Sequence, residues 1–116
     1  MNRYKLSKAG INATAGIKRF CGNAEMYEKY LMEFPDDHNY GALCAAIAAS
    51  DVHASFDAAH ALKGLSGTLS MEKLYGDVSI LVEELRKDSL VHAEALLQPV
   101  KEDYATVLAA LQENAG

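Results

Sequence analysis

The residues best suited to chemistry lie in the segment AHALKGLSGTLS, residues 59–70. His60 comes three residues before Lys63, and two glycines, Gly64 and Gly67, follow. An exposed imidazole changes charge near neutral pH, so its neutral, nucleophilic form is abundant in a cell. A lysine three residues further along a helix can reach the ring, and its ammonium binds phosphate as a point charge. The pattern therefore indicates an imidazole that can accept and release an anionic group such as phosphoryl.

The two glycines are unusual in a helix, where each costs about 1 kcal/mol relative to alanine. At about 100° per residue, both lie on one outward stripe with His60. Two more polar residues, His53 and Asp57, share this stripe, and Asp57 is a candidate for orienting the imidazole or holding its proton. Glycines on an exposed face leave the surface low, so a second macromolecule can approach the histidine from above.

The opposite side of the same segment is apolar and is predicted to face the core. Its members are Ala54, Ala58, Ala61, Leu62, Leu65 and Leu69. Their spacing favours a helix that continues through both glycines. The alternative is a helix that ends at Lys63, with Gly64 as the first residue beyond it and a loop after that.

The composition is typical of one soluble globular domain. The chain has 116 residues, 50% of them hydrophobic, and a formal net charge of −5, so it can bury a core and has little attraction for nucleic acid or an anionic membrane. No apolar run approaches the roughly 20 residues that cross a bilayer, and no signal peptide is visible. Cys21 and Cys44 fit no zinc or redox spacing. We therefore expect a reducing, cytoplasmic environment.

Helical periodicity dominates the chain, and no segment alternates like a strand. After a lead-in over residues 1–11, a short helix is expected between a cap at Asn12 and a stop at Gly22. Four long helices are expected over residues 23–47, 50–69, 70–87 and 88–111. Pro35 interrupts the first of them, and Pro99 kinks the last or begins a new helix. The expected N-caps of the long helices are Asn23, Ser50 or Asp51, Ser70, and Asp88 or Ser89.

These elements predict an all-α fold, an antiparallel four-helix bundle with a short additional N-terminal helix. Residues 1–11 form the lead-in, and residues 12–114 form a single domain. The connections between the helices are short, and the sequence contains no internal repeat.

The motif residues His60, Leu62, Lys63, Gly64, Gly67 and Leu69 read H-x-L-K-G-x-x-G-x-L. This pattern resembles the phosphoacceptor motif of the histidine-containing phosphotransfer (HPt) family, the helical-bundle intermediates of multistep phosphorelays. The segment AGINATAGIKRFCGNAEMYEKYLMEF resembles the opening of the family, and MEKLYGDVSILVEELRK resembles the helix after the motif. The likeness therefore covers nearly the whole chain in the right order.

The resemblance implies a role for each motif position. His60 would carry the phosphoryl group on a ring nitrogen, and Lys63 would help to neutralise it. Gly64 would leave room for the group and for the docking partner, while Gly67 would keep the same surface low. The family has no kinase activity and no cofactor of its own, because a receiver domain supplies the phosphorylated aspartate and the Mg²⁺. The implied partners are receiver domains and a sensor or hybrid histidine kinase, and we expect a monomer.

The sequence departs from the family pattern at two positions. Many members have glycine where this chain has Ser70, which is here expected to cap the next helix. Many also place Gln or Glu on the following helix to hold the imidazole, and the aligned residue here is Val82. Ring orientation would then come from another group, such as Asp57 or a water molecule.

Two other functions remain open from the sequence. His53, Asp57 and His60 share one helix face at a spacing that suits metal ligation, although bundle metal sites are normally built inward. A bundle of HPt shape that binds a receiver or kinase without carrying phosphate is the second alternative. In either HPt reading, Phe56 is a candidate docking residue together with Asp57 and Gly67, or else a residue at the edge of the core.

Overall fold

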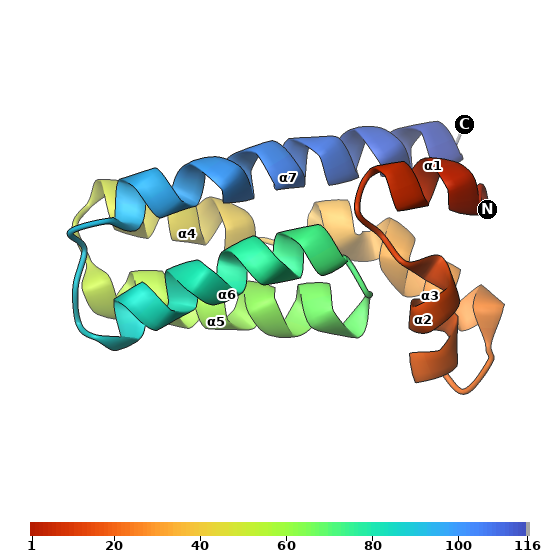
Figure 1. Ribbon diagram of the computed structural model, residues 1–116, viewed down its shortest axis with the longest axis horizontal. Helices are drawn as coiled ribbons and strands as arrows, with labels where there is room; N and C mark the ends of the chain where they lie inside the picture. The colour runs from red at the N-terminus through yellow and green to blue at the C-terminus, as the bar shows by residue number, and fades with distance from the viewer. Residues whose placement is uncertain (116) are drawn as a thin grey trace.

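The computed structural model describes residues 1–115, which form seven α-helices, one short 3-10 helix and no strand (Figure 1). The elements are α1 (Arg3–Lys8), α2 (Ala13–Arg19), α3 (Ala24–Glu33), η1 (Phe34–Asp36), α4 (Asn39–Ala48), α5 (Val52–Thr68), α6 (Glu72–Arg86) and α7 (Ala93–Ala115). The expected all-α fold is therefore confirmed.

The four C-terminal helices pack against one another in chain order. α5 contacts both α4 and α6, α6 contacts α7, and α7 in turn contacts α4 and α3. Figure 1 shows α5 and α6 side by side, with the long α7 running along α6. Because short connections join these helices, each runs antiparallel to the one before it.

The N-terminal segment contains one helix more than expected. Helix α1 forms within the expected lead-in, residues 1–11, and packs against α7 with Leu6 fully buried. Figure 1 shows α1 beside the C-terminal end of α7. The chain after α1 pairs with the turn between α5 and α6 through a β-bridge from Ile11 to Met71. Helix α1 was not predicted, because a single buried side chain in six residues gives no helical repeat of apolar positions.

Side-chain caps begin several helices at the expected residues. Asn12, Asn23 and Asp51 each accept a hydrogen bond of 3.0 Å from the backbone N–H three residues later. Pro35 lies in η1 and separates α3 from α4, as predicted. Pro99 lies inside the continuous α7, so it does not start a new helix.

The caps expected at Ser70 and Asp88 are wrong, because both residues end the preceding helix. Their φ angles are 55° and 59°, the left-handed conformation that closes a helix at its C-terminus. The N–H of Met71 donates to the carbonyl of Ser66 at 2.9 Å and completes this ending for α5. An N-cap needs an extended backbone, so Ser70 cannot serve both helices. Nor does Ser89 cap α7, which begins further along the chain.

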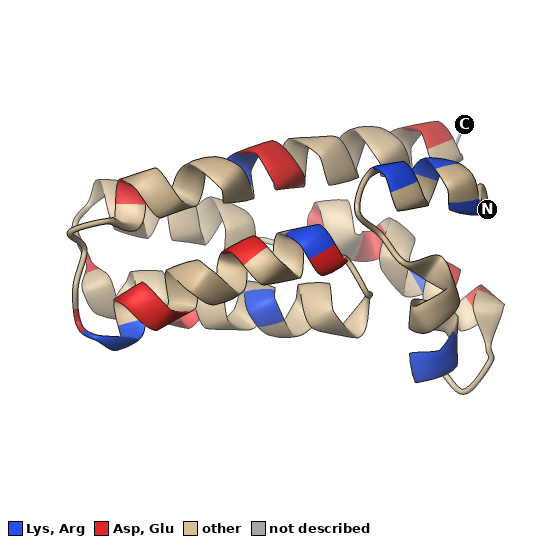
Figure 2. Cartoon of the chain, in the orientation of Figure 1, with Lys and Arg blue, Asp and Glu red and all other residues tan. Residues whose placement is uncertain are grey.

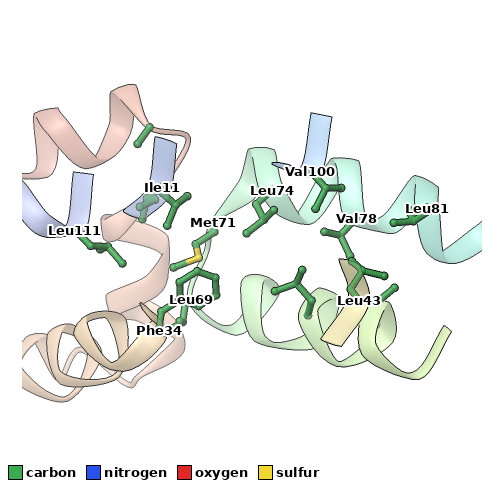
Figure 3. Close-up of a cluster of buried hydrophobic side chains, with 14 of the residues drawn as sticks. Ile11, Phe34, Leu43, Leu69, Met71, Leu74, Val78, Leu81, Val100 and Leu111 are labelled. Carbon is green, nitrogen blue, oxygen red and sulfur yellow. The ribbon is translucent and has the colours of Figure 1, made fainter. Parts of the chain in front are cut away.

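Apolar side chains from all the long helices meet in a single core (Figure 3). Those labelled in the figure are Ile11, Phe34, Leu43, Leu69, Met71, Leu74, Val78, Leu81, Val100 and Leu111. Cys21 is exposed and Cys44 is half-buried, and both are free thiols. None of the helices within residues 1–115 combines the length and apolarity needed to cross a bilayer.

Tyr27 of α3 ties the N-terminal helices to the end of α5. Its ring is fully buried, and its hydroxyl donates a hydrogen bond of 2.8 Å to the carbonyl of Leu69. Gly16 of α2 provides the space, because a Cβ there would collide with the Tyr27 ring. Burial raises the pKa of Tyr27 to about 12. The α2–α3 pair therefore supports the C-terminal end of α5, where the motif ends.

Charged residues of both signs are mixed along the helices (Figure 2), but one acid, Asp103 of α7, is only 6% exposed. The Oδ1 of Asp103 lies 2.9 Å from the Nζ of Lys73, a residue of α6. The same Nζ lies 3.4 Å from the Oδ2 of Asp77. Burial, first, and the neighbouring Asp77 raise the pKa of Asp103 to about 6, against the opposing effect of Lys73. At neutral pH the folded protein therefore carries a buried carboxylate at Asp103, and the ammonium of Lys73 only partly offsets the cost of burying its negative charge.

We expect Asp103→Asn to be more stable than the wild type at pH 7.5. An acid whose pKa is higher in the folded state contributes stability below its unfolded pKa, near 3.9, and this contribution is lost as the pH rises through the folded value. The amide reproduces the protonated form at every pH. The gain of the variant should therefore appear between about pH 4 and pH 6 and remain constant above that range.

Urea unfolding at several pH values between 4.5 and 8 measures this difference. Glu102→Gln, which changes the exposed acid next to Asp103 in the chain, serves as the matched control. Parallel pH profiles for the wild type and Asp103→Asn would contradict the prediction.

Candidate functional site

Helix α5 carries the motif from His60 to Gly67, with Leu69 as its C-cap residue, and is continuous through both glycines. It extends from the Asp51 cap to Thr68, so Gly64 and Gly67 lie inside the helix. The alternative of a helix that ends at Lys63 is therefore wrong. The segment stays helical because its inner face packs against α4 and α6, which offsets the low helix propensity of glycine.

The buried face of α5 is rotated relative to the sequence prediction. Ala58, Leu62 and Leu69 are buried as expected, but Ala54 and Ala61 are exposed and Leu65 is only half-buried. The remaining buried positions are Ser55, Ala59 and Ser66.

Two of the buried residues are serines whose hydroxyl groups form hydrogen bonds within the helix. The hydroxyl of Ser55 donates to the carbonyl of Asp51 at 2.7 Å, and that of Ser66 donates to the carbonyl of Lys63 at 3.1 Å. A serine that bonds to its own helix can be buried without an unsatisfied group. A prediction based only on apolar residues therefore assigned part of the wrong face of α5 to the core.

The outward stripe contains His60 as predicted. The histidine is exposed near the middle of α5, and His53, Asp57 and Gly64 are exposed along the same helix. A Cβ built on Gly64 meets no atom within 4 Å. The surface next to the imidazole is therefore open in the direction of the helix C-terminus.

Gly67, which was expected on the exposed stripe with His60, is half-buried and differs from Gly64 in its surroundings. A Cβ at Gly67 would lie 3.1 Å from Cε2 of Tyr75, a residue of α6. The missing side chain therefore makes room for an aromatic ring that lies against α5. The Nζ of Lys63 lies 5.9 Å from the centre of this ring, within the range of a cation–π contact.

The imidazole of His60 stacks on an aromatic ring one turn towards the N-terminus of α5. The rings of Phe56 and His60 are stacked, with centroids 5.6 Å apart and an angle of 24° between their planes. Phe56 is half-buried and packs against the core. The guanidinium carbon of Arg86 lies 5.3 Å from the centre of the Phe56 ring. Phe56 is therefore a residue at the edge of the core that also lies against the histidine.

Within residues 1–115, no hydrogen bond holds the His60 ring. Val82 of α6 is fully buried and apolar, so it offers no acceptor. Asp57 is exposed on the same helix and forms no hydrogen bond with the imidazole. The stacking against Phe56 is therefore the contact that orients the ring in this structure.

Two neighbours of the site were not identified from the sequence. These are Tyr75 and Arg86, which lie outside the motif in the sequence. Both belong to α6, and their approach to α5 depends on how the two helices are rotated against each other. The low surface at Gly67 was the one available signal, because a missing side chain often marks a close neighbour.

The part of the chain that the structure describes offers no metal site. Among residues 1–115, no three His, Cys, Asp or Glu side chains are gathered closely enough to hold a metal ion. His53, Asp57 and His60 lie along one exposed helix face, without ligands from a second helix.

The comparisons with known proteins agree with this geometry. The family model described as Hpt domain matches residues 25–114, a range that includes the motif and helices α4 to α6 entirely. No curated protein and no solved structure gives a significant match. Because the family model covers most of the sequence, the chain belongs to the Hpt domain family.

Proposed function

We propose that the protein is a phosphorelay intermediate. It accepts a phosphoryl group on His60 from the aspartate of one receiver domain and passes it to the aspartate of another. The observation that carries this proposal is the exposed imidazole in the middle of α5, with the open surface at Gly64 beside it. Membership of the Hpt domain family supports the same role.

The transfer step requires little chemistry from this chain. The unprotonated ring nitrogen of His60 attacks the phosphorus of the aspartyl phosphate, and the bond between phosphorus and the carboxylate oxygen breaks. The carboxylate leaves with the electron pair, and the second ring nitrogen keeps its proton. A receiver aspartate reverses the step when it attacks the phosphohistidine. The receiver supplies the Mg²⁺, and this chain supplies the nucleophile and the cation of Lys63.

The same proposal assigns the fold and the partners. The antiparallel four-helix bundle of the family comprises the interrupted segment α3–η1–α4 together with α5, α6 and α7. Helix α2 is the short additional N-terminal helix, and α1 precedes it. The protein acts as a cytoplasmic monomer, without kinase activity or a cofactor of its own. Receiver domains dock over the motif and contact Phe56, Asp57 and Gly67, and a sensor or hybrid histidine kinase supplies the phosphate.

His60→Gln should abolish phosphoryl transfer. A receiver domain is charged with labelled acetyl phosphate and Mg²⁺, separated from the donor, and mixed with the wild type or the variant. We expect an acid-labile, alkali-stable label on the wild type and none on His60→Gln, because glutamine has no nucleophilic ring nitrogen. His53→Gln, on the same exposed helix face, is the matched control and should accept phosphate normally.

Two outcomes would contradict the proposal. Equal labelling of His60→Gln and the wild type would exclude His60 as the acceptor. Binding of receivers without labelling of the wild type, across a panel of receiver domains, would show the adaptor function instead.

Gly64→Gln should raise the stability of the fold but slow phosphoryl transfer from the receiver. The added side chain meets no atom within 4 Å at its Cβ, so the better helix propensity of glutamine should raise the free energy of unfolding by about 0.5 kcal/mol. The same side chain should obstruct a docked receiver and slow transfer from it at least about tenfold, the effect of about 1.4 kcal/mol at the interface.

Gly76→Gln is the control, because Gly76 lies in α6 outside the motif and its Cβ also meets no atom within 4 Å. This variant should gain similar stability and keep its transfer rate. Chemical denaturation and the receiver assay measure the two quantities. An unchanged transfer rate in Gly64→Gln would show that the receiver does not approach over Gly64.

A further inference from the structure

Phe56 links the phosphoacceptor to a second cation that the motif does not contain. Its ring is stacked on the imidazole of His60 and also lies under the guanidinium of Arg86. Arg86 belongs to the last turn of α6, so this cluster joins two helices. A shallow pocket between them is lined by Phe56, Arg86, His53 and Leu85, among others.

The charge of a phosphoryl group calls for more than one cation at this site. Such a group carries about −1.5 to −2 charges at neutral pH. Lys63 supplies one positive charge, and its Nζ rests on the Tyr75 ring towards the C-terminal end of α5. Arg86 is the cation towards the N-terminal end of α5, with its guanidinium carbon 5.3 Å from the centre of the Phe56 ring that also stacks on the imidazole.

Building on the proposed phosphorelay function, the geometry points to Arg86 as a second phosphate-binding residue at His60, and to Phe56 as the positioning residue that holds the imidazole and the guanidinium side by side. In the unphosphorylated protein both cations rest on aromatic rings, Lys63 on Tyr75 and Arg86 on Phe56. The phosphoryl group draws both of them over the histidine.

Arg86 is free enough to make this movement. Its side chain is 52% exposed, and its other contact is an ion pair of 3.4 Å with Glu83, which is itself exposed. Exposed ion pairs and exposed cation–π contacts are both weak. A guanidinium binds phosphate oxygens with two parallel hydrogen bonds, which are stronger than either contact. The exchange therefore favours the phosphorylated site.

The same arrangement accounts for Val82. With a buried apolar residue at this position, the side chain there cannot accept a hydrogen bond from the imidazole. The stacking contact with Phe56 takes over the orientation of the ring. One turn further along α6, Arg86 gives that helix a group that recognises the phosphoryl product.

Labelling with phosphoramidate tests the role of Arg86 without any partner protein. This small donor transfers its phosphoryl group to the imidazole and releases ammonia, and ³¹P NMR follows the product. The variants are Arg86→Gln and Arg86→Lys, with Lys87→Gln as the matched control, since it removes one positive charge from the neighbouring exposed residue.

We expect Arg86→Gln to be labelled about tenfold more slowly than Lys87→Gln, the effect of one lost charge-assisted hydrogen bond. The pKa of the phosphoryl group, read from its ³¹P shift, should be higher in Arg86→Gln, because a nearby cation favours the dianion. Arg86→Lys should recover part of both effects. Equal rates and equal ³¹P titrations in Arg86→Gln and Lys87→Gln would overturn the assignment of Arg86.

The role of Phe56 has a separate readout. In the wild type, the ring protons of His60 and the side-chain protons of Arg86 should show shifts from the Phe56 ring current, and the Nε–H signal of Arg86 should move on phosphorylation. Phe56→Leu should lose the ring-current shifts and slow labelling, whereas Phe56→Tyr should restore both. Normal labelling of Phe56→Leu, despite the lost shifts, would show that Phe56 has only a packing role.

Failure of this inference is distinguishable from failure of the proposed function. If neither phosphoramidate nor a charged receiver labels His60 of the wild type, both proposals are wrong. If the wild type is labelled and Arg86→Gln behaves like Lys87→Gln, only the assignment of Arg86 is wrong.

Discussion

The burial of one face of α5 against α4 and α6 is the constraint on which the site depends. This packing keeps residues 52–68 helical although two interior positions are glycine. The helix in turn sets the imidazole of His60, the ammonium of Lys63 and the open backbone at Gly64 within one turn of each other. A local break at Gly64 would separate these groups, so tertiary packing maintains a geometry that propensity alone disfavours.

The elements outside the motif serve the same helix. The end of α5 is closed by Ser70 in a left-handed conformation, and its carbonyl at Leu69 accepts a hydrogen bond from the buried Tyr27. The β-bridge between Ile11 and Met71 attaches the N-terminal helices to the next residues of the chain. The left-handed backbone at Ser70 is one that glycine adopts without strain and serine adopts at a cost. Serine here therefore reflects a tolerated cost and not a helix cap.

The surroundings of His60 combine weak contacts with an exposed ring. Aromatic side chains lie on both sides of it along α5, and each holds one cation at a distance typical of cation–π pairs. Such contacts order the cations without neutralising them, because a ring face carries no net charge. For the proposed uptake and release of a phosphoryl group, cations that are near but held only by weak contacts are an advantage: Arg86 is held by the Phe56 ring and by an exposed ion pair with Glu83.

The helical periodicity, the caps at Asn12, Asn23 and Asp51, and the motif from His60 to Leu69 were determined by the sequence itself, because each depends on residues within a few positions of one another. Where two local patterns competed, as at Ser70 and Asp88, the sequence could not decide between beginning one helix and ending another. The rotation that buries Ser55 and Ser66 and the approach of Tyr75 and Arg86 to α5 were decided only by the tertiary structure. These contacts join separate helices, and the packing of the whole core sets the register between them.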